Sequence, residues 1–449
     1  MKSSETRTPI ASENTFEKTG KEVTSRRAVA VSLVGTAVEY YDFAIYGYFA
    51  TVLAGVFFVD SDPNAAMLKT LATFAIAYFC RVPGSILFGH IGDKYGRKKA
   101  LSLTILLMCI STAGIGILPS YATLGIWATL ALVLLRCIQG ISAGGEAGGA
   151  AAYVAEYAPP RHRALYVCSV NVGANFGGLF ASLVGIGLTS AFPSDVISDW
   201  AWRVPFLLSI PLALVGLWIR LRMEDSPEFL KMAESENIES IPIKAIMKNH
   251  KLTMLRLFCL NAMATGGYWA SVIYATIFIQ QTAGHSAKFA FWSSIIALSF
   301  GTLVIPLSAY ASDRIGRKKV LLTGALSAVF LTLPGFHFMM SDSTFVGLVS
   351  QCLLTVPVSI TLGALFAASA EMLPVNVRYT GISLGNNLAN MLLGGTASMI
   401  CVWLIDVTNN SMAPSGFVIF CALLTLGATL SMKKNDRQQL PTSEVENAG

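Results

Sequence analysis

The strings GHIGDKYGRKK at residues 89–99 and AYASDRIGRKK at residues 309–319 are two copies of one pattern. In each copy an aspartate, Asp93 or Asp313, is followed after two residues by a glycine and then by Arg-Lys-Lys. Apolar segments long enough to cross a bilayer lie on both sides of each copy. We therefore predict short turns between membrane helices, at equivalent places in two related halves of the chain.

Two further repeats support this duplication. The pattern Glu-x-x-Pro-x-x-x-Arg occurs at residues 156–163 and again at residues 371–378. Two asparagines follow each arginine at the same offsets, namely Asn171 and Asn175, then Asn386 and Asn390. Three features in the same order indicate that a six-helix unit has been duplicated.

The composition places most of the chain in lipid. Of its 449 residues, 54% are hydrophobic and only 13% are charged, whereas a soluble domain has roughly 25% charged residues. Spans are predicted at residues 28–58, 68–91, 100–118, 122–149, 164–191, 201–221, 253–282, 288–311, 319–340, 344–371, 377–405 and 413–432. The predicted fold class is an all-α membrane protein with twelve transmembrane helices in two pseudo-symmetric six-helix bundles.

The polar segments divide the chain further. We predict a disordered cytoplasmic N-terminus at 1–27, an N-terminal bundle at 28–221, a charged cytoplasmic linker at 222–252, a C-terminal bundle at 253–432 and a cytoplasmic tail at 433–449. Basic residues are concentrated in alternate loops, so the positive-inside rule places both termini in the cytoplasm. The expected location is the inner or plasma membrane. The polar N-terminal residues do not resemble a cleavable signal peptide.

Other partners are not expected from the composition. The net charge of +6 is widely spread and does not suggest nucleic-acid binding. The eight cysteines lie almost entirely in apolar segments and show neither a disulfide framework nor zinc spacing, so no metal is expected. The expected partners are a small-molecule substrate and the lipid bilayer, and we expect the protein to be a monomer.

The repeated turns and charges predict a gate at the cytoplasmic face. Each repeated aspartate can face the positive end of another helix or pair with an arginine. Pairs between Glu156 and Arg163 and between Glu371 and Arg378 can hold the gate closed and separate when it opens. The predicted gate residues are Gly89, Asp93, Arg97, Glu156, Arg163, Asp313, Arg317, Glu371 and Arg378. The alternative is that these residues serve topology and folding alone.

Several strings narrow the comparison with known proteins. The two turn motifs and RCIQG at residues 136–140 resemble signatures of the major facilitator superfamily. More specific strings are EYYDF at 39–43, GGE at 144–146, WRVPF at 202–206, SPEF at 226–229 and RYTG at 378–381. Together they resemble the metabolite:proton symporter family, which includes carriers of shikimate, dicarboxylates, citrate and proline/betaine. The resemblance implies proton-coupled uptake of a small metabolite.

Charged side chains inside a membrane are costly, so they are candidates for function. Here they cluster in the first, second and fourth predicted spans. The candidates for proton coupling or substrate binding are Glu39, Asp42, Tyr46, Arg81, Arg136, Gln139, Glu146, Asn171, Asn175, Asn386 and Asn390. A buried carboxylate whose neighbours change between states can couple a proton to a solute. Arg136 can bind a substrate carboxylate through two parallel hydrogen bonds.

A structural interpretation of the same residues is also open. The charges can form a static arginine–carboxylate cluster that holds three spans together. The asparagines can form hydrogen bonds between helices, which are common in membrane bundles.

The preferred function is a secondary transporter that takes up a small organic acid or zwitterion by alternating access. The chain contains no GxxxxGK[ST] loop, so the proton gradient rather than ATP or a cofactor is the expected energy source. A GxSxG string at residues 140–144 lies inside a predicted span, and we do not expect an enzyme. The alternatives are an efflux antiporter for drugs or metabolites on the same fold, and a nutrient sensor that does not transport.

Overall fold

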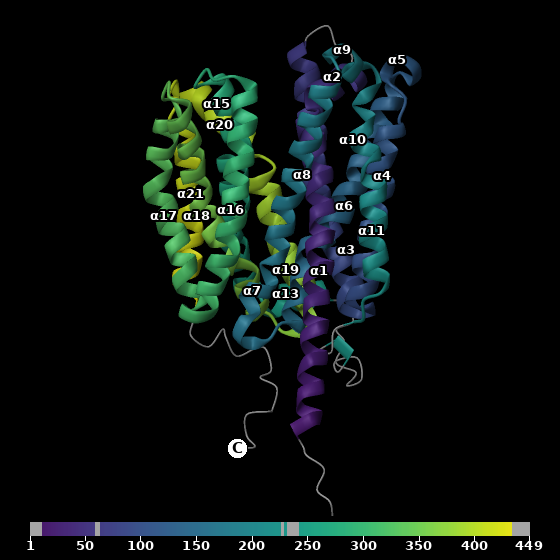
Figure 1. Cartoon of the computed structure of the whole chain (residues 1–449), viewed down its shortest axis with the longest axis vertical. Helices are drawn as coiled ribbons and strands as arrows, with labels where there is room; N and C mark the ends of the chain where they lie inside the picture. Colours follow the sequence, from purple (N-terminus) through teal and green to yellow (C-terminus); the bar gives the residue numbers. More distant parts are fainter. Residues whose placement is uncertain (1–10, 59–62, 226–228, 231–241, 433–449) are drawn as a thin grey trace, which may run out of the picture.

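The computed structural model describes residues 11–58, 63–225, 229–230 and 242–432. In this part of the chain twelve helices are long and apolar enough to cross a membrane, and no strand occurs. Figure 1 shows them as two bundles side by side, with the first half in purple to teal and the second half in green to yellow. The predicted fold class is confirmed.

The first bundle follows the predicted order of spans. Its helices are α1 (Ala11–Tyr48), α2 (Ala50–Phe57), α3 (Pro63–Tyr95), α4 (Arg97–Ile117), α6 (Ile126–Tyr157), α7 (Arg163–Val167), α8 (Ser169–Ala191), α10 (Arg203–Leu207) and α11 (Ser209–Leu221). Shorter turns between them are α5 (Tyr121–Leu124), η1 (Pro160–His162), α9 (Ser194–Val196) and η2 (Ile197–Ala201).

The second bundle repeats this order after a short helix, α13 (Pro242–Asn249), in the linker. Its elements are α14 (Lys251–Ala262), η3 (Met263–Gly267), η4 (Trp269–Tyr274), α15 (Ala275–Gln281), α16 (Ala287–Ile315), α17 (Arg317–Met339), α18 (Thr344–Glu371), η5 (Val375–Val377), α19 (Arg378–Ala389), η6 (Asn390–Gly394), α20 (Ala397–Thr408) and α21 (Ala413–Leu430).

The structure differs from the predicted spans at the N-terminus and within the seventh span, and the eleventh span also contains a π-helical turn, η6. The first helix already begins at Ala11, so residues 11–27, which we expected to be disordered, are helical. The seventh span is interrupted by two consecutive π-helical turns, η3 and η4. Its apolar composition gave no sign of this, although π-helical turns are frequent at functional sites. Residues 1–10, residues 59–62, the parts of the predicted linker at 226–228 and 231–241, and the predicted tail at 433–449 lie outside the described residues.

The repeated glycine-arginine step forms the same sharp turn in both halves. Gly96 separates α3 from α4 with φ 104°, and Gly316 separates α16 from α17 with φ 100°. A side chain at such a positive φ is strained, so glycine permits the next helix to start at once with Arg97 or Arg317. We call the end of the molecule that carries these two turns the basic end.

Small residues let the helices of the first bundle approach closely. Carbon atoms added at Gly140 and Gly144 of α6 would collide with the backbone carbonyls of Ala77 and Arg81 in α3. Such spacing of glycines brings two backbones together and increases van der Waals contact in lipid. The close approach also brings the polar face of α6 against α3, so the candidate residues of both helices lie in one cluster.

Candidate transport site and basic-end contacts

Arg81 and Glu39 form a buried ion pair between α3 and α1. Arg81 Nη2 lies 3.0 Å from Glu39 Oε1, and both side chains are almost fully buried. Neither oxygen of Glu39 accepts a hydrogen bond of normal geometry from the described residues. The guanidinium also stacks over Phe43 and Tyr78, with 4.2 Å and 4.9 Å to the ring centroids. The predicted contact between spans one and two therefore exists, and it leaves the carboxylate with unused acceptor capacity.

Asp42 is linked to Arg136 through two intermediate side chains. Arg136 Nη1 donates to Gln139 Oε1 at 2.7 Å, and Gln139 Nε2 donates to Thr112 Oγ1 at 2.5 Å. The Thr112 hydroxyl in turn donates to Asp42 Oδ2 at 2.7 Å. The chain runs across α6, α4 and α1, so a change of charge on Asp42 reaches Arg136 through hydrogen bonds and without direct contact.

Aromatic rings surround the guanidinium of Arg136. Its Cζ lies 4.1 Å from the ring centroid of Tyr46, 5.0 Å from that of Phe43 and 5.3 Å from that of Phe74. Its Nε and Nη2 are buried and have no hydrogen-bond partner among the described residues. A buried arginine with two free donors is suited to bind an anionic group of a ligand.

Glu146 has a partner that the sequence analysis missed. Its carboxylate forms a bidentate ion pair with Arg220 of α11, with one contact, from Arg220 Nη1 to Glu146 Oε2, at 3.0 Å. Thr104 Oγ1 also donates to Glu146 Oε2 at 2.7 Å. Gly35 of α1 makes the space for this pair, because an added Cβ there would collide with both Arg220 and Glu146. Arg220 stood at the end of a predicted span, where a basic residue needs no buried partner.

Aromatic side chains of both halves meet beside this polar cluster. Trp269 of η4 packs edge-on against Phe74 and Tyr78 of α3, with centroid distances of 6.2 Å and 5.7 Å. Tyr268 donates to Asn175 Oδ1 at 3.3 Å. The interrupted seventh span thus brings its aromatic residues against the charged half.

The four asparagines have different surroundings. Asn175 donates to Thr302 Oγ1 at 3.1 Å, and Asn171 donates to the carbonyl of Leu362 at 2.8 Å, so both reach the other half. Asn390 instead donates to the carbonyl of Asn386 at 3.2 Å, within one helix turn. The amide that crosses from the second half is the neighbouring Asn387, which donates to the carbonyl of Gly144 at 2.7 Å. The two pairs are therefore not equivalent in space.

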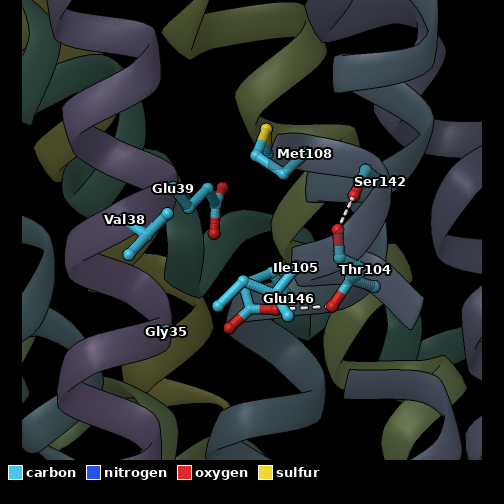
Figure 2. A pocket seen from close by; sticks show the side chains of 8 residues that line it. All are labelled: Gly35, Val38, Glu39, Thr104, Ile105, Met108, Ser142 and Glu146. Carbon is cyan, nitrogen blue, oxygen red and sulfur yellow. Dashed lines mark hydrogen bonds between the residues drawn. The ribbon is translucent and has the colours of Figure 1, made fainter. Parts of the chain in front are cut away.

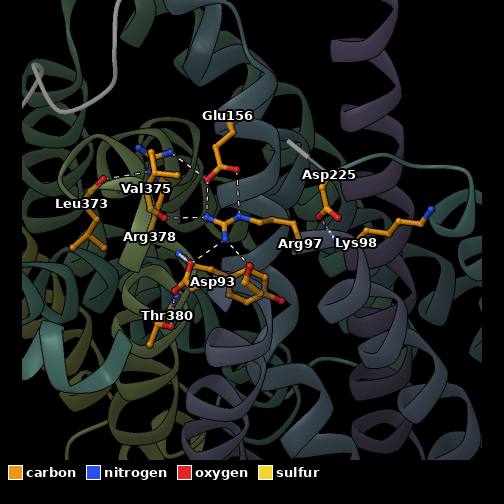
Figure 3. A network of polar contacts seen from close by, with 11 residues as sticks. Asp93, Arg97, Lys98, Glu156, Asp225, Leu373, Val375, Arg378 and Thr380 are labelled. Atoms are coloured by element: carbon orange, nitrogen blue, oxygen red, sulfur yellow. Dashed lines mark hydrogen bonds and ion pairs between the residues drawn. The ribbon is translucent and has the colours of Figure 1, made fainter. Parts of the chain in front are cut away.

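At the basic end, Asp93 caps a helix of the other half. The backbone amides of Tyr379 and Thr380, at the start of α19, donate to its carboxylate at 3.2 Å and 3.0 Å. The Thr380 hydroxyl adds a third bond at 2.7 Å (Figure 3). Amides at a helix N-terminus carry partial positive charge and lack partners in their own helix, so a buried carboxylate stabilises them.

Asp313 makes the reciprocal contact. The amides of Ala164 and Leu165, in the first turn of α7, donate to its carboxylate at 3.0 Å and 2.9 Å. Each half therefore caps a helix of the other with the aspartate of its repeated motif. The repeated motif predicted a contact with some helix N-terminus, but its spacing alone did not show that this contact crosses between the halves.

The glutamates and arginines of the second repeat also pair across the halves. Glu156 Oε1 lies 3.0 Å from Arg97 Nη2 and 3.2 Å from Arg378 Nη1 (Figure 3). Glu371 Oε1 lies 2.8 Å from Arg317 Nη2 and 3.9 Å from Arg163 Nη1. The expected pairs within each half, Glu156 with Arg163 and Glu371 with Arg378, are replaced by crossed pairs. The cause is the packing of α7 and α19, which follow each repeat, against the opposite half.

Each motif aspartate also forms an ion pair with the arginine of its own motif. Arg97 lies 3.2 Å from Asp93, and Arg317 lies 2.6 Å from Asp313. Gly89 completes this end of the interface, since an added Cβ would lie 2.8 Å from the Cα of Thr380. All nine residues predicted for the gate therefore lie in the contacts between the halves or directly beside them.

No metal site is found in the described part of the chain, where no group of three or more His, Cys, Asp or Glu side chains is placed to hold an ion. The eight cysteines all lie in this part and are free. The polar clusters of the interior are instead composed of arginines, carboxylates, hydroxyls and amides, which suit the binding of protons and polar solutes.

Two six-helix bundles, a buried polar cluster beside their interface and paired contacts at one end define a membrane transporter of the two-bundle class. The chain belongs to the Major Facilitator Superfamily, whose family model matches residues 32–399. Membership confirms that it is a transporter rather than an enzyme.

Several relatives have the names of carriers that the motifs predicted. The chain is 36% identical to the inner membrane metabolite transport protein YhjE of Escherichia coli (strain K12) over 428 residues, covering 93% of this chain and 96% of the relative. It is 31% identical to the proline/betaine transporter of Salmonella typhimurium (strain LT2), covering 92% and 85%. It is 32% identical to the shikimate transporter of E. coli (strain K12), covering 92% and 95%.

The fold is also found among solved structures. The proton:xylose symporter XylE, bound to 6-bromo-6-deoxy-D-glucose, matches with a TM-score of 0.72 at 19% identity and covers 91% of this chain and 95% of its own. At this identity the comparison concerns the fold alone. It confirms the arrangement of two bundles that the internal repeats predicted.

Proposed function

We propose that the protein is a proton-coupled symporter that takes up a small organic acid or zwitterion across the inner membrane by alternating access. The observation that carries this proposal is the chain of hydrogen bonds from Asp42 to Arg136. One end of the chain is a buried carboxylate that can take a proton, and the other is a buried arginine with free donors. Proton binding at one end and solute binding at the other are thereby linked.

In this mechanism the solute carboxylate binds to the free donors of Arg136, beside the aromatic rings of Phe74, Tyr78 and Trp269. Aromatic faces attract the cationic group of a zwitterion as well as apolar carbon. The names of the relatives, which include carriers of proline, betaine and shikimate, agree with this chemistry. Glu39 and Asp42 serve as the proton-coupling carboxylates in the proposal.

We further propose that the basic end faces the cytoplasm and that its contacts are a gate, which is closed in this conformation. The positive-inside rule supports the orientation, since both Gly-Arg-Lys-Lys turns lie at this end. The gate consists of the two aspartate caps and the two crossed charge clusters. Its opening requires that these contacts separate while the bundles rock about the central site.

The test is uptake by the purified protein in proteoliposomes. Radiolabelled shikimate, proline and glycine betaine are offered in turn under an inward proton gradient, with and without a protonophore. We expect at least one to be accumulated and the accumulation to collapse with the protonophore. Asp42→Asn should reduce this accumulation about tenfold or more, since coupling free energies of about 1–3 kcal/mol correspond to changes of roughly 5- to 150-fold. Asp342→Asn, at an exposed loop position, is the matched control.

Two outcomes would contradict the proposal. Uptake that is indifferent to the proton gradient would exclude proton coupling. Export of lipophilic cations from loaded vesicles, in place of uptake, would support the efflux alternative. The buried guanidinium of Arg136 beside the site disfavours that alternative because it repels a cationic substrate, whereas the charge of Arg81 is balanced by Glu39.

A further inference from the structure

A small cavity lies between two carboxylates inside the first bundle, away from the interface between the halves. Glu39 of α1 and Glu146 of α6 both line it, together with Thr104 of α4 and Ser142 of α6 (Figure 2). It has room for about one water molecule. Most of its wall is apolar, and the carboxylate oxygens of Glu39 and Glu146 at its edge are the acceptors that a water there would bridge.

The carboxylate of Glu39 is the unusual member of this cavity. It is 1% exposed and neither oxygen accepts a hydrogen bond of normal geometry from the described residues, although Arg81 lies beside it. Figure 2 shows the group projecting from α1 into the space between the helices, on the same side of α1 as Glu146. A buried carboxylate with free acceptor positions that borders a water-sized space is a binding site for that water.

Glu146 lies nearer to the basic end than Glu39. The Arg220–Glu146 pair contacts the position of Gly35, which precedes Glu39 by one turn of α1, or roughly 6 Å along the helix axis. Arg81 of α3, Arg220 of α11, and the hydroxyls of Thr104 and Ser142 face the two carboxylates. Asp42 lies one turn further along α1, and the phenol of Tyr379 of α19 lies near Glu146. The two glutamates thus stand in sequence between the central site and the basic end.

We propose that this cavity holds a water that passes a proton from Glu39 to Glu146, and that Glu146 is a second proton site positioned by Arg220. The inference rests on the proposed symport function and deepens it. In the transfer the O–H bond of protonated Glu39 breaks, and the water accepts that proton while it gives one of its own to a Glu146 oxygen. Negative charge moves from Glu146 to Glu39, where Arg81 is its counter-ion.

The proposal separates the proton's path from the solute's path. The solute binds at the interface between the halves, whereas the proton moves inside the first bundle, between α1, α4 and α6, towards the basic end. Protonation of Glu146 removes the charge that Arg220 neutralises, so it loosens the contact of α6 with α11. Protonation of Glu146 therefore alters the contacts of α6, which is one of the helices that form the basic end.

The first experiment needs no substrate. The full-length protein in proteoliposomes is titrated with pH while infrared spectroscopy records the protonated carboxyl band. We expect Glu39→Gln and Glu146→Gln each to remove one titrating component, and Glu146→Asp to retain a shifted component. If Glu146→Gln removes none, Glu146 is a static partner of Arg220 and the proposal is overturned.

The second experiment blocks the cavity without changing any charge. Ile105→Phe on α4 fills the space, and Leu103→Phe is its control because Leu103 lies on the same helix and is 39% exposed. Proton entry is followed with an internal pH dye, using whichever of shikimate, proline or glycine betaine the wild type accumulates. We expect Ile105→Phe to reduce proton entry about a hundredfold or more, as for loss of a proton-transfer group. Equal rates of proton entry in Ile105→Phe and Leu103→Phe would overturn the proposed proton route through the cavity.

The two failures can be told apart. If the wild type accumulates solute without moving protons, the proposed symport fails and the relay fails with it. If proton-driven uptake is intact in the wild type and in Ile105→Phe, only the relay fails. The melting temperature of Glu146→Gln, compared with that of the wild type, shows whether the variant is folded.

Discussion

Glu156 belongs to the first half of the chain and Arg378 to the second, yet their side chains form an ion pair at 3.2 Å. Both are buried, and Glu156 binds Arg97 of its own half at the same time. A pair of this kind stabilises only conformations in which the two halves meet at the basic end, which is the closed state of the proposed gate. The contribution of this ion pair to the stability of the closed state can therefore be measured from the frequency with which the basic end opens.

Arg378→Gln should open the basic end more often. Removing one partner of a buried pair costs up to about 3–5 kcal/mol, and less where a second arginine remains. We therefore expect roughly tenfold faster labelling of a cysteine at position 383, introduced as Ser383→Cys, by a membrane-impermeant maleimide added at the basic end. Ser383 is buried against Gly148 in the closed state. Arg314→Gln, at an exposed position, should leave the rate unchanged.

The two aspartate caps should differ in strength. Asp93 accepts two amides and the Thr380 hydroxyl, whereas the described contacts of Asp313 with α7 are two amides alone. Loss of a helix cap costs about 1 kcal/mol, and a hydrogen bond to a charged group adds about 1.5–3 kcal/mol. Asp93→Asn should therefore accelerate labelling at position 383 more than Asp313→Asn. Equal effects, or a larger effect of Asp313→Asn, would contradict this ranking.

Gly89→Ala should prevent full closure of the basic end. The added Cβ would lie 2.7 Å from Thr380 Oγ1 and 2.8 Å from its Cα, so α3 and α19 must move apart. Uptake should fall about tenfold or more, since small steric changes in packed interfaces cost 1–3 kcal/mol. Gly187→Ala is the matched control, because nothing lies within 4 Å of its added carbon. If both variants transport alike, the contact at Gly89 is not required.

Arg136→Lys should weaken solute binding while it preserves the charge. Lysine cannot supply two parallel donors, nor stack over Tyr46 as the planar guanidinium does. Loss of such hydrogen bonds costs about 1.5–3 kcal/mol, so the KM for a carboxylate solute should rise roughly 10- to 100-fold. The melting temperature of the solute-free protein serves as the control. A KM that stays within about twofold of the wild-type value would exclude Arg136 from the binding site.

The sequence predicted the fold well because lipid imposes strong constraints. A span needs about twenty apolar residues, so composition alone located twelve of them. The repeated motifs then located the residues of the basic end, since Asp93 and Asp313 recur with the same neighbours. The clustering of charge in the first half was likewise visible, and the ion pair of Arg81 with Glu39 follows it.

The partners within these clusters could not be predicted. Spacing suggested that Glu156 pairs with Arg163, but α7 and α19 turn towards the opposite half and exchange the partners. Arg220 was missed because its contact with Glu146 depends on the missing side chain of Gly35, far away in the sequence. Contacts of this kind depend on how helices are rotated and packed, which a hydropathy pattern does not record.

The two caps carry a consequence for the origin of the chain. Asp93 binds the amides of α19, and Asp313 binds those of α7, so each half offers one acid and one helix N-terminus. A two-fold rotation that exchanges the halves also exchanges the two contacts, as in an isologous homodimer. A single ancestral six-helix unit with one such acid and one such helix would satisfy both contacts by pairing with its own copy. The chain has both copies of that self-complementary surface, whereas the buried ion pairs of Arg81 with Glu39 and of Arg220 with Glu146 lie in the first half alone among the described residues.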